Sequence, residues 1–544
     1  MTDSSSPPPP PGPPAPARLG SSPSFLSGNR LWLLIVLLML TGAILPVLMP
    51  CQEEGHPLEV VLLQVNDVYE IAGLDNGAIG GMARIATLKQ QLLSANGNTL
   101  LVMAGDFISP SIFNSARQDD KEIAGRQMID AMNAARFDLV IFGNHEFDFK
   151  YSILQQRIDE STFQWLASNV HHRMGTDSMP FQKKHADIPA SWTRRFDDGK
   201  GHSATIGFIG LTIPDNQGDS NYAFYDSTLA TAKRLYAQLA PTCDAVIAIT
   251  HQDIKDDIIL ADSLPGLTAI MGGHEHDMQF KKVGEVYIAK AHANAKTAFK
   301  WKIVFDKKGK RPYVYPSLLS IDSSLPKDVL TAAIVDKWMD AGKEYFKNKG
   351  YHPDSPLCQG LNSSLDGRDE SIRSRPTALT QLITNAMLWV TRPYHTQIAL
   401  MNAGSIRVDD IITPPITEYS FLRALPYGGP VQVATFKGAF LKYLLDSAAK
   451  LTKDGAFLQY SDNLRKDPAT RQWMVGKAPM ADSTDYSVAI ADYLVFNRQK
   501  KLKFIRENGR LIDSIPNGAT GPDLRIDVVK ATIAYYRQTC SGHP

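Results

Sequence analysis

Six residues of metal-binding types stand at or just after short apolar runs of the sequence. They are two aspartates, one asparagine and three histidines: Asp67, Asp106, Asn144, His251, His274 and His276. Carboxylate, amide and imidazole groups together favour a pair of divalent ions such as Mn²⁺, Zn²⁺, Co²⁺ or Mg²⁺. A carboxylate that bridges two such ions would hold them roughly 3.5–4 Å apart, which is the two-metal arrangement that hydrolyses phosphate esters.

The apolar runs that precede these residues are short and rich in valine and isoleucine. They span residues 60–65, 100–104, 139–142, 245–249 and 267–271. Continuous runs of this length are typical of strands buried on both faces. Helical patterns over 82–93 and 122–135 lie between the runs, so strands and helices alternate. In such α/β sheets the strand ends meet in one crevice, and we expect the six side chains to converge there.

A second α/β region is predicted near the C-terminus. Residues 327–345 indicate one helix, and His-Pro-Asp-Ser-Pro at 352–356 then breaks the chain. The elements expected beyond the break are helices over 374–390 and 438–450 and strands over 398–401, 431–436 and 486–491. We therefore predict a first domain over 57–310, a linker with a helix over 311–354, and a second domain over 355–544.

Composition and charge exclude several classes of protein. The 57 Lys and Arg residues nearly balance 56 Asp and Glu, which excludes the basic footprint of a general nucleic-acid-binding protein. No nucleic-acid polymer is therefore expected as a partner. Hydrophobic residues make up 44% of the chain, which is typical of a globular protein. The 4 cysteines are too few and too scattered for a zinc module or a disulfide scaffold, and the sequence selects no pairing.

The N-terminus differs from the rest of the chain. Residues 1–29 are rich in Pro, Ser and Gly, which predicts a disordered tail. Residues 31–49 carry no charge and are long enough to cross a ~30 Å hydrocarbon core, so residues 30–50 are predicted to be a transmembrane anchor. Arg18 and Arg30 precede the uncharged segment, which places the N-terminus in the cytoplasm and both domains in the periplasm or outside the cell. A cleaved signal peptide is the alternative.

The motifs around the six candidate ligands resemble those of the calcineurin-like metallophosphoesterase superfamily. Its pattern is D-x-H, GD, GNH[ED], H and GHxH, and the corresponding residues here are 67–69, 105–106, 143–146, 251 and 273–276. The resemblance covers about residues 58–310 and implies a four-layer α/β sandwich. It also implies two metal sites, the first formed by Asp67, Asp106 and His276 and the second by Asp106, Asn144, His251 and His274.

One residue departs from that pattern. The histidine of D-x-H is replaced by Tyr69, within Asn-Asp-Val-Tyr-Glu-Ile. A neutral phenol, with a pKa of about 10, is a poor ligand for a divalent ion. A phenolate could bind a harder metal, a water could take its place, or Glu70 could swing in. Tyr69 is therefore a possible metal ligand, and the identity of the first metal stays open.

His145 follows Asn144 and is expected to face the substrate without binding metal. In the family this histidine stabilises the pentacoordinate phosphorane and can protonate the leaving oxygen. Asp148 resembles the carboxylate that orients it, and such a partner fixes the tautomer and raises the basicity of the imidazole. The resemblance therefore implies that His145 and Asp148 act in catalysis.

The C-terminal region resembles the substrate-binding domain of the 5′-nucleotidase family. Residues 402–407 look like its N-x-G-x-I-R motif, while 426–429 and the later 437–438 resemble its P-F-x-x and K-G motifs. A guanidinium suits a phosphate geometrically, and aromatic rings can stack on a nucleobase. The implied substrate-binding residues are two arginines for phosphate, one asparagine facing the base and two tyrosines around the base: Arg373, Arg407, Asn402, Tyr427 and Tyr493.

A second departure follows Tyr493. The family has a Gly-Gly-Asp-Gly stretch whose aspartate holds the ribose, whereas this chain has Val-Phe-Asn-Arg-Gln-Lys-Lys over 495–501, with Gln499 at the aspartate position. An amide can still bind a hydroxyl, but the basic surroundings could favour an extra phosphate or another anionic group. Strict specificity for AMP is therefore not implied.

The predicted function is an exported, metal-dependent phosphohydrolase, foremost a 5′-nucleotidase. By resemblance, a metal-bound hydroxide attacks the 5′-phosphorus and the second domain rotates to deliver the nucleotide. The enzymatic alternatives are a 2′,3′-cyclic nucleotide phosphodiesterase, a UDP-sugar hydrolase or another organophosphate phosphatase. A degenerate, non-catalytic nucleotide-binding surface protein is a further alternative, which only Tyr69 and the lost Gly-Gly-Asp-Gly stretch suggest. The preferred base and the oligomeric state stay open.

Overall fold

The computed structural model describes residues 57–214, 222–306, 310–358, 363–496 and 500–540. The predicted tail over 1–29 and the predicted anchor over 30–50 lie outside these residues. Among the helices of the described ranges, none has both the length and the apolar character needed to cross a bilayer. The residues from Pro57 onwards form one compact unit that contains two α/β domains.

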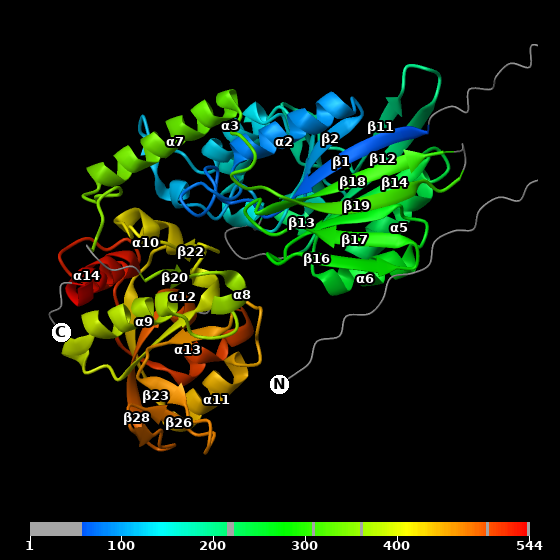
Figure 1. The fold of residues 1–544 in the computed structure, drawn as a ribbon. Helices are drawn as coiled ribbons and strands as arrows, with labels where there is room; N and C mark the ends of the chain where they lie inside the picture. The colour runs from blue at the N-terminus through cyan, green and yellow to red at the C-terminus, as the bar shows by residue number, and fades with distance from the viewer. Residues whose placement is uncertain (1–56, 215–221, 307–309, 359–362, 497–499, 541–544) are drawn as a thin grey trace, which may run out of the picture. The chain divides into compact units, whose positions relative to one another are not determined.

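The first domain is built around two six-stranded sheets (Figure 1). In spatial order, the first sheet contains β19 (Tyr313–Ser320), β18 (Thr297–Phe305), β1 (Leu58–Val65), β2 (Thr99–Met103), β5 (Leu139–Ile141) and β6 (Gln164–Leu166). The second contains β11 (Ser191–Asp197), β12 (Ser203–Thr212), β14 (Ala245–His251), β15 (Ala269–Gly273), β17 (Val286–Lys290) and β16 (Gln279–Val283). The facing sides of the sheets share one apolar core, which includes Leu62, Trp301 and Ile247.

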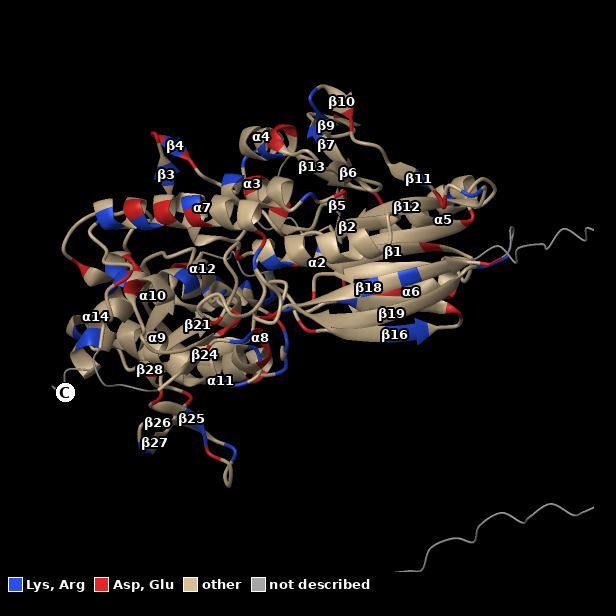
Figure 2. Cartoon of the chain, turned by 45° about the horizontal axis from the view of Figure 1, so that its top comes forward, with Lys and Arg blue, Asp and Glu red and all other residues tan. Residues whose placement is uncertain are grey.

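Helices cover the outer faces of both sheets. On the first sheet they are α2 (Met82–Ala95), α3 (Arg126–Ala134), α4 (Tyr151–Glu160) and α7 (Val329–Asn348), and on the second α5 (Thr228–Leu239) and α6 (Ile254–Ser263). Each helical layer closes a further apolar core. The predicted four-layer sandwich is therefore confirmed. Both acidic and basic residues lie along α7 (Figure 2).

All five apolar runs form strands, as predicted. Strands β1, β2 and β5 pair in parallel, and so do β14 and β15. The carboxyl ends of parallel strands lie at the same edge of their sheet, so the residues that follow these strands are brought together.

Two helices start four residues later than predicted. Helix α3 begins at Arg126 rather than at 122, because Gly125 has a φ of 86° and cannot continue a right-handed helix. Helix α9 (Ala378–Val390) begins four residues after 374, because Pro376 lacks a backbone N–H and Thr377 forms a capping box with Thr380. Strand β19 pairs with β18, so the first sheet also includes residues that the sequence placed in the linker.

The second domain has a five-stranded sheet between two helical layers. Its strands, in spatial order, are β24 (Leu458–Tyr460), β21 (Ile398–Asn402), β28 (Asp485–Ala491), β23 (Val431–Lys437) and β29 (Arg510–Asp513). One face packs on α9, α10 (Glu418–Ala424) and α14 (Val528–Cys540), and the other on α11 (Gly438–Ala448), α12 (Asp492–Val495) and α13 (Phe504–Asn508). Successive residues of β21 alternate between the two cores, as the pleat requires.

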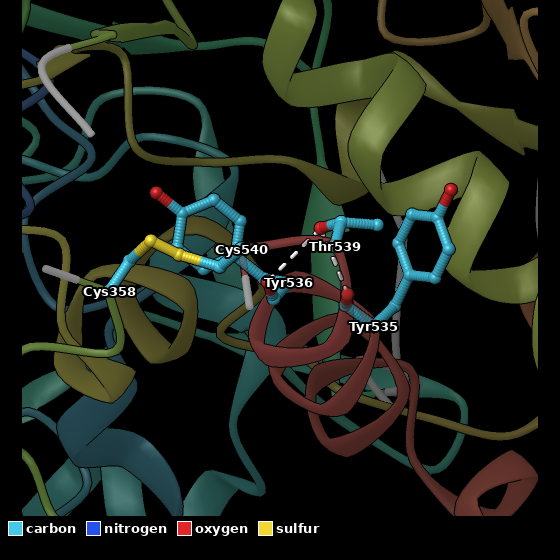
Figure 3. The surroundings of a disulfide bond; sticks show 5 residues. All are labelled: Cys358, Tyr535, Tyr536, Thr539 and Cys540. Carbon is cyan, nitrogen blue, oxygen red and sulfur yellow. Dashed lines mark hydrogen bonds between the residues drawn. A yellow bond between two sulfur atoms is a disulfide. The ribbon is translucent and has the colours of Figure 1, made fainter. Parts of the chain in front are cut away.

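A disulfide joins Cys358 to Cys540 at the end of α14 (Figure 3). The two Cα atoms are 5.9 Å apart, and the bond closes a sequence separation of 182 residues. The sequence left this pairing open. Cys243 is free within the described residues, and Cys51 lies outside them. The disulfide ties the start of the second domain to its last helix.

Candidate active site

The carboxyl ends of the strands bring the predicted metal ligands together. Asp67 and Asp106 follow β1 and β2, and His251 is the last residue of β14. One ligand atom from each of these three residues lies within 4.8 Å of the others, and all three are buried. The edge of the sandwich therefore holds a compact Asp-Asp-His cluster.

The backbone is unusual at this cluster. Asp67 and Asp106 have φ angles of 52° and 56°, and His274 has a φ of 89°. Such left-handed conformations are costly for residues other than glycine and concentrate at functional sites. A Cβ at Gly143 would overlap the carboxylate of Asp106, so only glycine fits before Asn144. The turns are thus shaped to point polar groups inward.

The environment of His251 fits a divalent cation. Its Nδ1 lies 2.8 Å from the carbonyl oxygen of Ala104, to which it donates a hydrogen bond. Its Nε2 then faces two carboxylates, 3.1 Å from Asp106 and 3.9 Å from Asp67. Burial alone would lower the pKa of His251, but Asp106 and Asp67 raise it to about 10. The cluster therefore attracts positive charge, which a metal ion can supply in place of a proton.

The remaining ligands of the predicted second site lie beside His251. The rings of His251 and His274 are 5.3 Å apart. His274 Nδ1 is 3.2 Å from Asn144 Oδ1, and the His274 backbone donates to Asp67. Imidazole and amide groups are both ligands for divalent cations, and at this spacing they can share one. The structure therefore brings together the residues predicted for the second site.

Tyr69 lies among the ligands of the predicted first site. Its hydroxyl is 3.4 Å from Asp67 Oδ1, 3.2 Å from Asp106 Oδ2 and 3.1 Å from His276 Nε2. Burial, Asp106 and Asp67 raise the pKa of Tyr69. Glu70 does not turn toward this cluster, because its carboxylate pairs with Arg423 at 2.9 Å. Of Tyr69 and Glu70, it is the Tyr69 phenol that lies within reach of a metal bound at this cluster.

We predict opposite effects for two changes at Tyr69. Tyr69→His should tighten binding of the first metal, because a neutral imidazole is a better ligand than a phenol. Tyr69→Phe should weaken that binding if the phenol is a ligand, because it removes the only polar atom of the side chain. Titration of metal-free protein with Mn²⁺ measures both effects. Identical metal affinities in all three proteins would exclude Tyr69 as a ligand.

His145 contacts groups from both domains. Its Nδ1 lies 2.8 Å from Asp148 Oδ2, and its Nε2 lies 2.6 Å from Nη2 of Arg407. Burial alone would lower the pKa of His145, but the carboxylates of Asp148 and Asp106 outweigh burial and raise it. The predicted pair of His145 and Asp148 is therefore in contact, with the Nε2 edge of the imidazole turned toward Arg407 of the second domain.

Glu146 has a structural role that its sequence motif alone did not reveal. Its carboxylate is fully buried and accepts hydrogen bonds from four backbone N–H groups: Asp106, Phe107, Ile108 and Gly143. Burial and the nearby Asp106 raise the pKa of Glu146 to about 7. The residue joins the turn after β2 to the turn after β5. In the sequence, the only feature that marks Glu146 is its place beside His145 in the Gly-Asn-His-Glu motif.

A cavity of about 1160 Å³ connects this cluster with the second domain. Its walls include candidate metal ligands and the catalytic pair: Asp106, Asn144, His274, His276, His145 and Asp148. They also include all five predicted substrate-binding residues: Arg373, Asn402, Arg407, Tyr427 and Tyr493. Residues from distant parts of the sequence thus line one space.

The substrate-binding candidates differ in how they are held. Asn402 accepts a hydrogen bond from Ser405 at 2.8 Å, so its amide is fixed within its own loop. Tyr427 is 51% exposed, and the guanidinium of Arg407 lies 6.0 Å from the centre of its ring. An exposed ring at the cavity wall is available for stacking. Gln499 lies outside the described residues.

The sequence matches two family models, calcineurin-like phosphoesterase over residues 60–278 and 5′-nucleotidase, C-terminal domain, over residues 360–503. The chain belongs to the 5′-nucleotidase family. It is 24% identical over 451 residues to human 5′-nucleotidase, covering 74% of each chain. It is 26% identical over 464 residues to protein UshA of Yersinia enterocolitica, covering 75% of this chain and 80% of that protein.

Solved structures share the fold of this 5′-nucleotidase family member. A 5′-nucleotidase precursor from Thermus thermophilus superposes with a TM-score of 0.70 at 22% identity, covering 89% of this chain and 97% of the other. Membership of the family makes the chain a hydrolase that acts on phosphoric ester bonds. The family implies divalent metal ions, and the buried cluster of Asp67, Asp106 and His251 is a suitable place for them.

Proposed function

We propose that this protein is a 5′-nucleotidase that releases phosphate from nucleoside 5′-monophosphates with the help of two divalent ions. One observation carries the proposal. The candidate metal ligands and the candidate nucleotide-binding residues line the same cavity, where Arg407 of the second domain reaches His145 of the first at 2.6 Å. A substrate that spans this cavity would place its phosphate at the cluster and its base in the second domain.

Two sets of residues would hold the metals. The first comprises Asp67, Asp106 and His276, with Tyr69 as a possible fourth ligand, and the second comprises Asp106, Asn144, His251 and His274. When bound, divalent ions would neutralise the phosphate and lower the pKa of the attacking water. Asp106 belongs to both sets, and its two oxygens already face different partners, His145 N and His251 Nε2.

The arginines and His145 would act on the phosphate directly. The guanidinium groups of Arg407 and Arg373 both line the cavity and would bind phosphate oxygens. Asp148 accepts a hydrogen bond from Nδ1–H of His145, so the Nε2 edge of the ring would face the phosphate. His145 would hold a proton at Nε2 and deliver it to the departing 5′ oxygen. Phosphate would take the place that Arg407 now occupies beside His145.

The base would stack between Tyr427 and Tyr493, and Tyr427→Ala tests this. We expect the change to raise KM for AMP, because stacking is worth about 1–3 kcal/mol per base and one lost stack therefore costs about 5–150-fold. If the stack is made equally in the ground and transition states, kcat should change little. Hydrolysis of p-nitrophenyl phosphate, which has no base, should be nearly unchanged.

Tyr443→Ala is a matched control for that change. Tyr443 lies on α11 of the same domain, is 61% exposed and is not among the residues that line the cavity. It should leave both substrates unaffected. Equal losses for AMP and p-nitrophenyl phosphate in Tyr427→Ala would indicate a folding defect and would exclude the stacking role.

A substrate panel tests the proposed function itself. The purified protein, loaded separately with Mn²⁺, Zn²⁺, Co²⁺ or Mg²⁺, is assayed with nucleoside 5′-monophosphates, a 2′,3′-cyclic nucleotide, a UDP-sugar and p-nitrophenyl phosphate. The proposal predicts the highest kcat/KM for a 5′-monophosphate. A higher value for any other member of the panel would replace 5′-nucleotidase with that activity.

We also propose that the enzyme is exported and anchored by residues 30–50. The uncharged segment 31–49 and the Cys358–Cys540 disulfide support this, because structural disulfides persist in oxidising compartments. In cells that produce the full chain, protease added outside the cytoplasm should degrade both domains, and only detergent should release the intact protein from membranes. A mature chain that lacks its first 50 or so residues would instead indicate a cleaved signal peptide.

A further inference from the structure

A buried carboxylate from the second domain lies against a candidate metal ligand of the first. Asp369 Oδ2 is 2.5 Å from Nδ1 of His276, while Nε2 of the same ring faces Tyr69 at 3.1 Å. Nδ1 of His276 thus faces the Asp369 carboxylate, and Nε2 faces the candidate metal cluster. We infer that Asp369 is a positioning residue that orients His276 toward the first metal, an inference that rests on the proposed function.

The chemistry of histidine ligands supports this role. A metal-binding histidine usually donates its second N–H to a carboxylate, which fixes the tautomer and makes the ring a stronger ligand. That contribution matters here because the first site has Tyr69 where the family has a histidine. A stronger His276 compensates for a weaker ligand at position 69.

Asp369 is itself held firmly in place. It is 4% exposed and is the first residue of α8 (Asp369–Ile372). Its carboxylate pairs with Arg373 at 2.6 Å, and its backbone N–H donates to Asp409 Oδ1 at 3.1 Å. Asp409 in turn pairs with Lys296 of the first domain at 2.7 Å. The carboxylate is therefore presented to His276 by a fixed network across the two domains.

This network connects the two halves of the active site. Arg373 is a proposed phosphate-binding residue, and Asp369 contacts both Arg373 and His276. If Asp369 only neutralises Arg373, its removal should leave metal binding unchanged. If Asp369 orients His276, its removal should weaken one metal site and leave the other intact. Metal affinity therefore separates the two roles without reference to catalytic rate.

The test compares Asp369→Ala, Asp369→Asn and wild-type full chain. Each protein is stripped with a chelator and titrated with Mn²⁺ in competition with a chelating dye. We expect wild type to bind two ions and Asp369→Ala to bind one of them about 10–100-fold more weakly, as for other residues that orient metal ligands. Asp369→Asn should lose less, because its amide oxygen can still accept the His276 N–H.

Thr413→Val is the matched control. It breaks another cross-domain contact, because the Thr413 hydroxyl lies 3.3 Å from Asp75 Oδ1 and 3.4 Å from Asn76 Nδ2, and neither contact involves His276. It should bind both ions with affinities within about threefold of wild type, because Thr413 belongs to neither metal site. Melting curves of the metal-free proteins check folding. If Asp369→Ala does not fold, the metal affinities of Asp369→Asn are compared with those of wild type instead.

Three results would overturn the inference. Two unchanged affinities in a folded Asp369 variant would show that Asp369 does not support a metal ligand. The same selective loss in Thr413→Val would attribute the effect to the packing of the two domains in general. A wild-type protein that binds no divalent ion would overturn the proposed function together with this inference, and only that result affects both.

Discussion

Asp106→Asn is expected to abolish phosphate release, because one change weakens both metal sites. The Asp106 carboxylate lies 3.2 Å from the Tyr69 hydroxyl and 3.1 Å from His251 Nε2, so it stands between the two ligand sets. Asparagine keeps the shape of the side chain but removes its charge. Lewis-acid stabilisation is worth several kcal/mol, so we expect a fall of about 10³-fold or more in kcat. Phosphate release and metal content are measured on the same preparation.

Asp482→Asn is the control for that change. Asp482 pairs with Lys442 on the surface, its side chain is 72% exposed, and the loss of such a pair should affect neither activity nor metal content. Metal content near two ions per chain in Asp106→Asn, together with normal turnover, would show that Asp106 does not bridge the ions.

His145→Ala is expected to lower kcat by about 10²–10⁴-fold, as for the loss of a general acid or of a group that stabilises the transition state. The side chain pairs with Asp148 and Arg407 and belongs to neither proposed set of metal ligands, so the metal content should stay at the wild-type value. Asp148→Asn should cost less, because it only disturbs the orientation of the ring. Loss of one bound ion in His145→Ala would reassign His145 as a metal ligand.

The positions of the metal ligands could be predicted because two rules act together. Apolar runs of Val and Ile predict buried parallel strands, and parallel strands end at a common edge. Asp67 and Asp106 follow such runs of the first sheet and His251 ends a run of the second, so their convergence depends on the strand order and on the face-to-face packing of the two sheets. Family motifs then separate these residues from other histidines and aspartates.

Contacts between distant segments could not be predicted in the same way. Asp369 meets His276, and Arg423 meets Glu70, only because the second domain packs against the edge of the first. Neither pair has a spacing or a motif that marks it. Tyr69 was predictable only in part. The sequence shows that it replaces the histidine of the motif, but the position of its hydroxyl depends on how the turn after β1 folds.

Predicted helix boundaries were wrong where a single residue interrupts a helical pattern. The apolar residues over 122–135 recur at helical spacing, but Gly125 takes a left-handed conformation, so the helix starts only at Arg126. The edge strands β16 and β19 were not predicted, since their exposed positions weaken the apolar signal. Strand β18 is largely buried and was also not predicted, because Lys300 and Lys302 interrupt its apolar run.

Two-metal hydrolysis of a nucleotide is tested most directly by a metal titration with simultaneous assay of AMP hydrolysis. Metal-free full chain receives Mn²⁺, Zn²⁺, Co²⁺ or Mg²⁺ in steps, while bound ions, adenosine and phosphate are counted. We expect no turnover without metal, equal amounts of adenosine and phosphate, and full activity only when a second ion is bound per chain. Undiminished AMP hydrolysis by the metal-free protein, or none with any of the four ions, would contradict the proposed function.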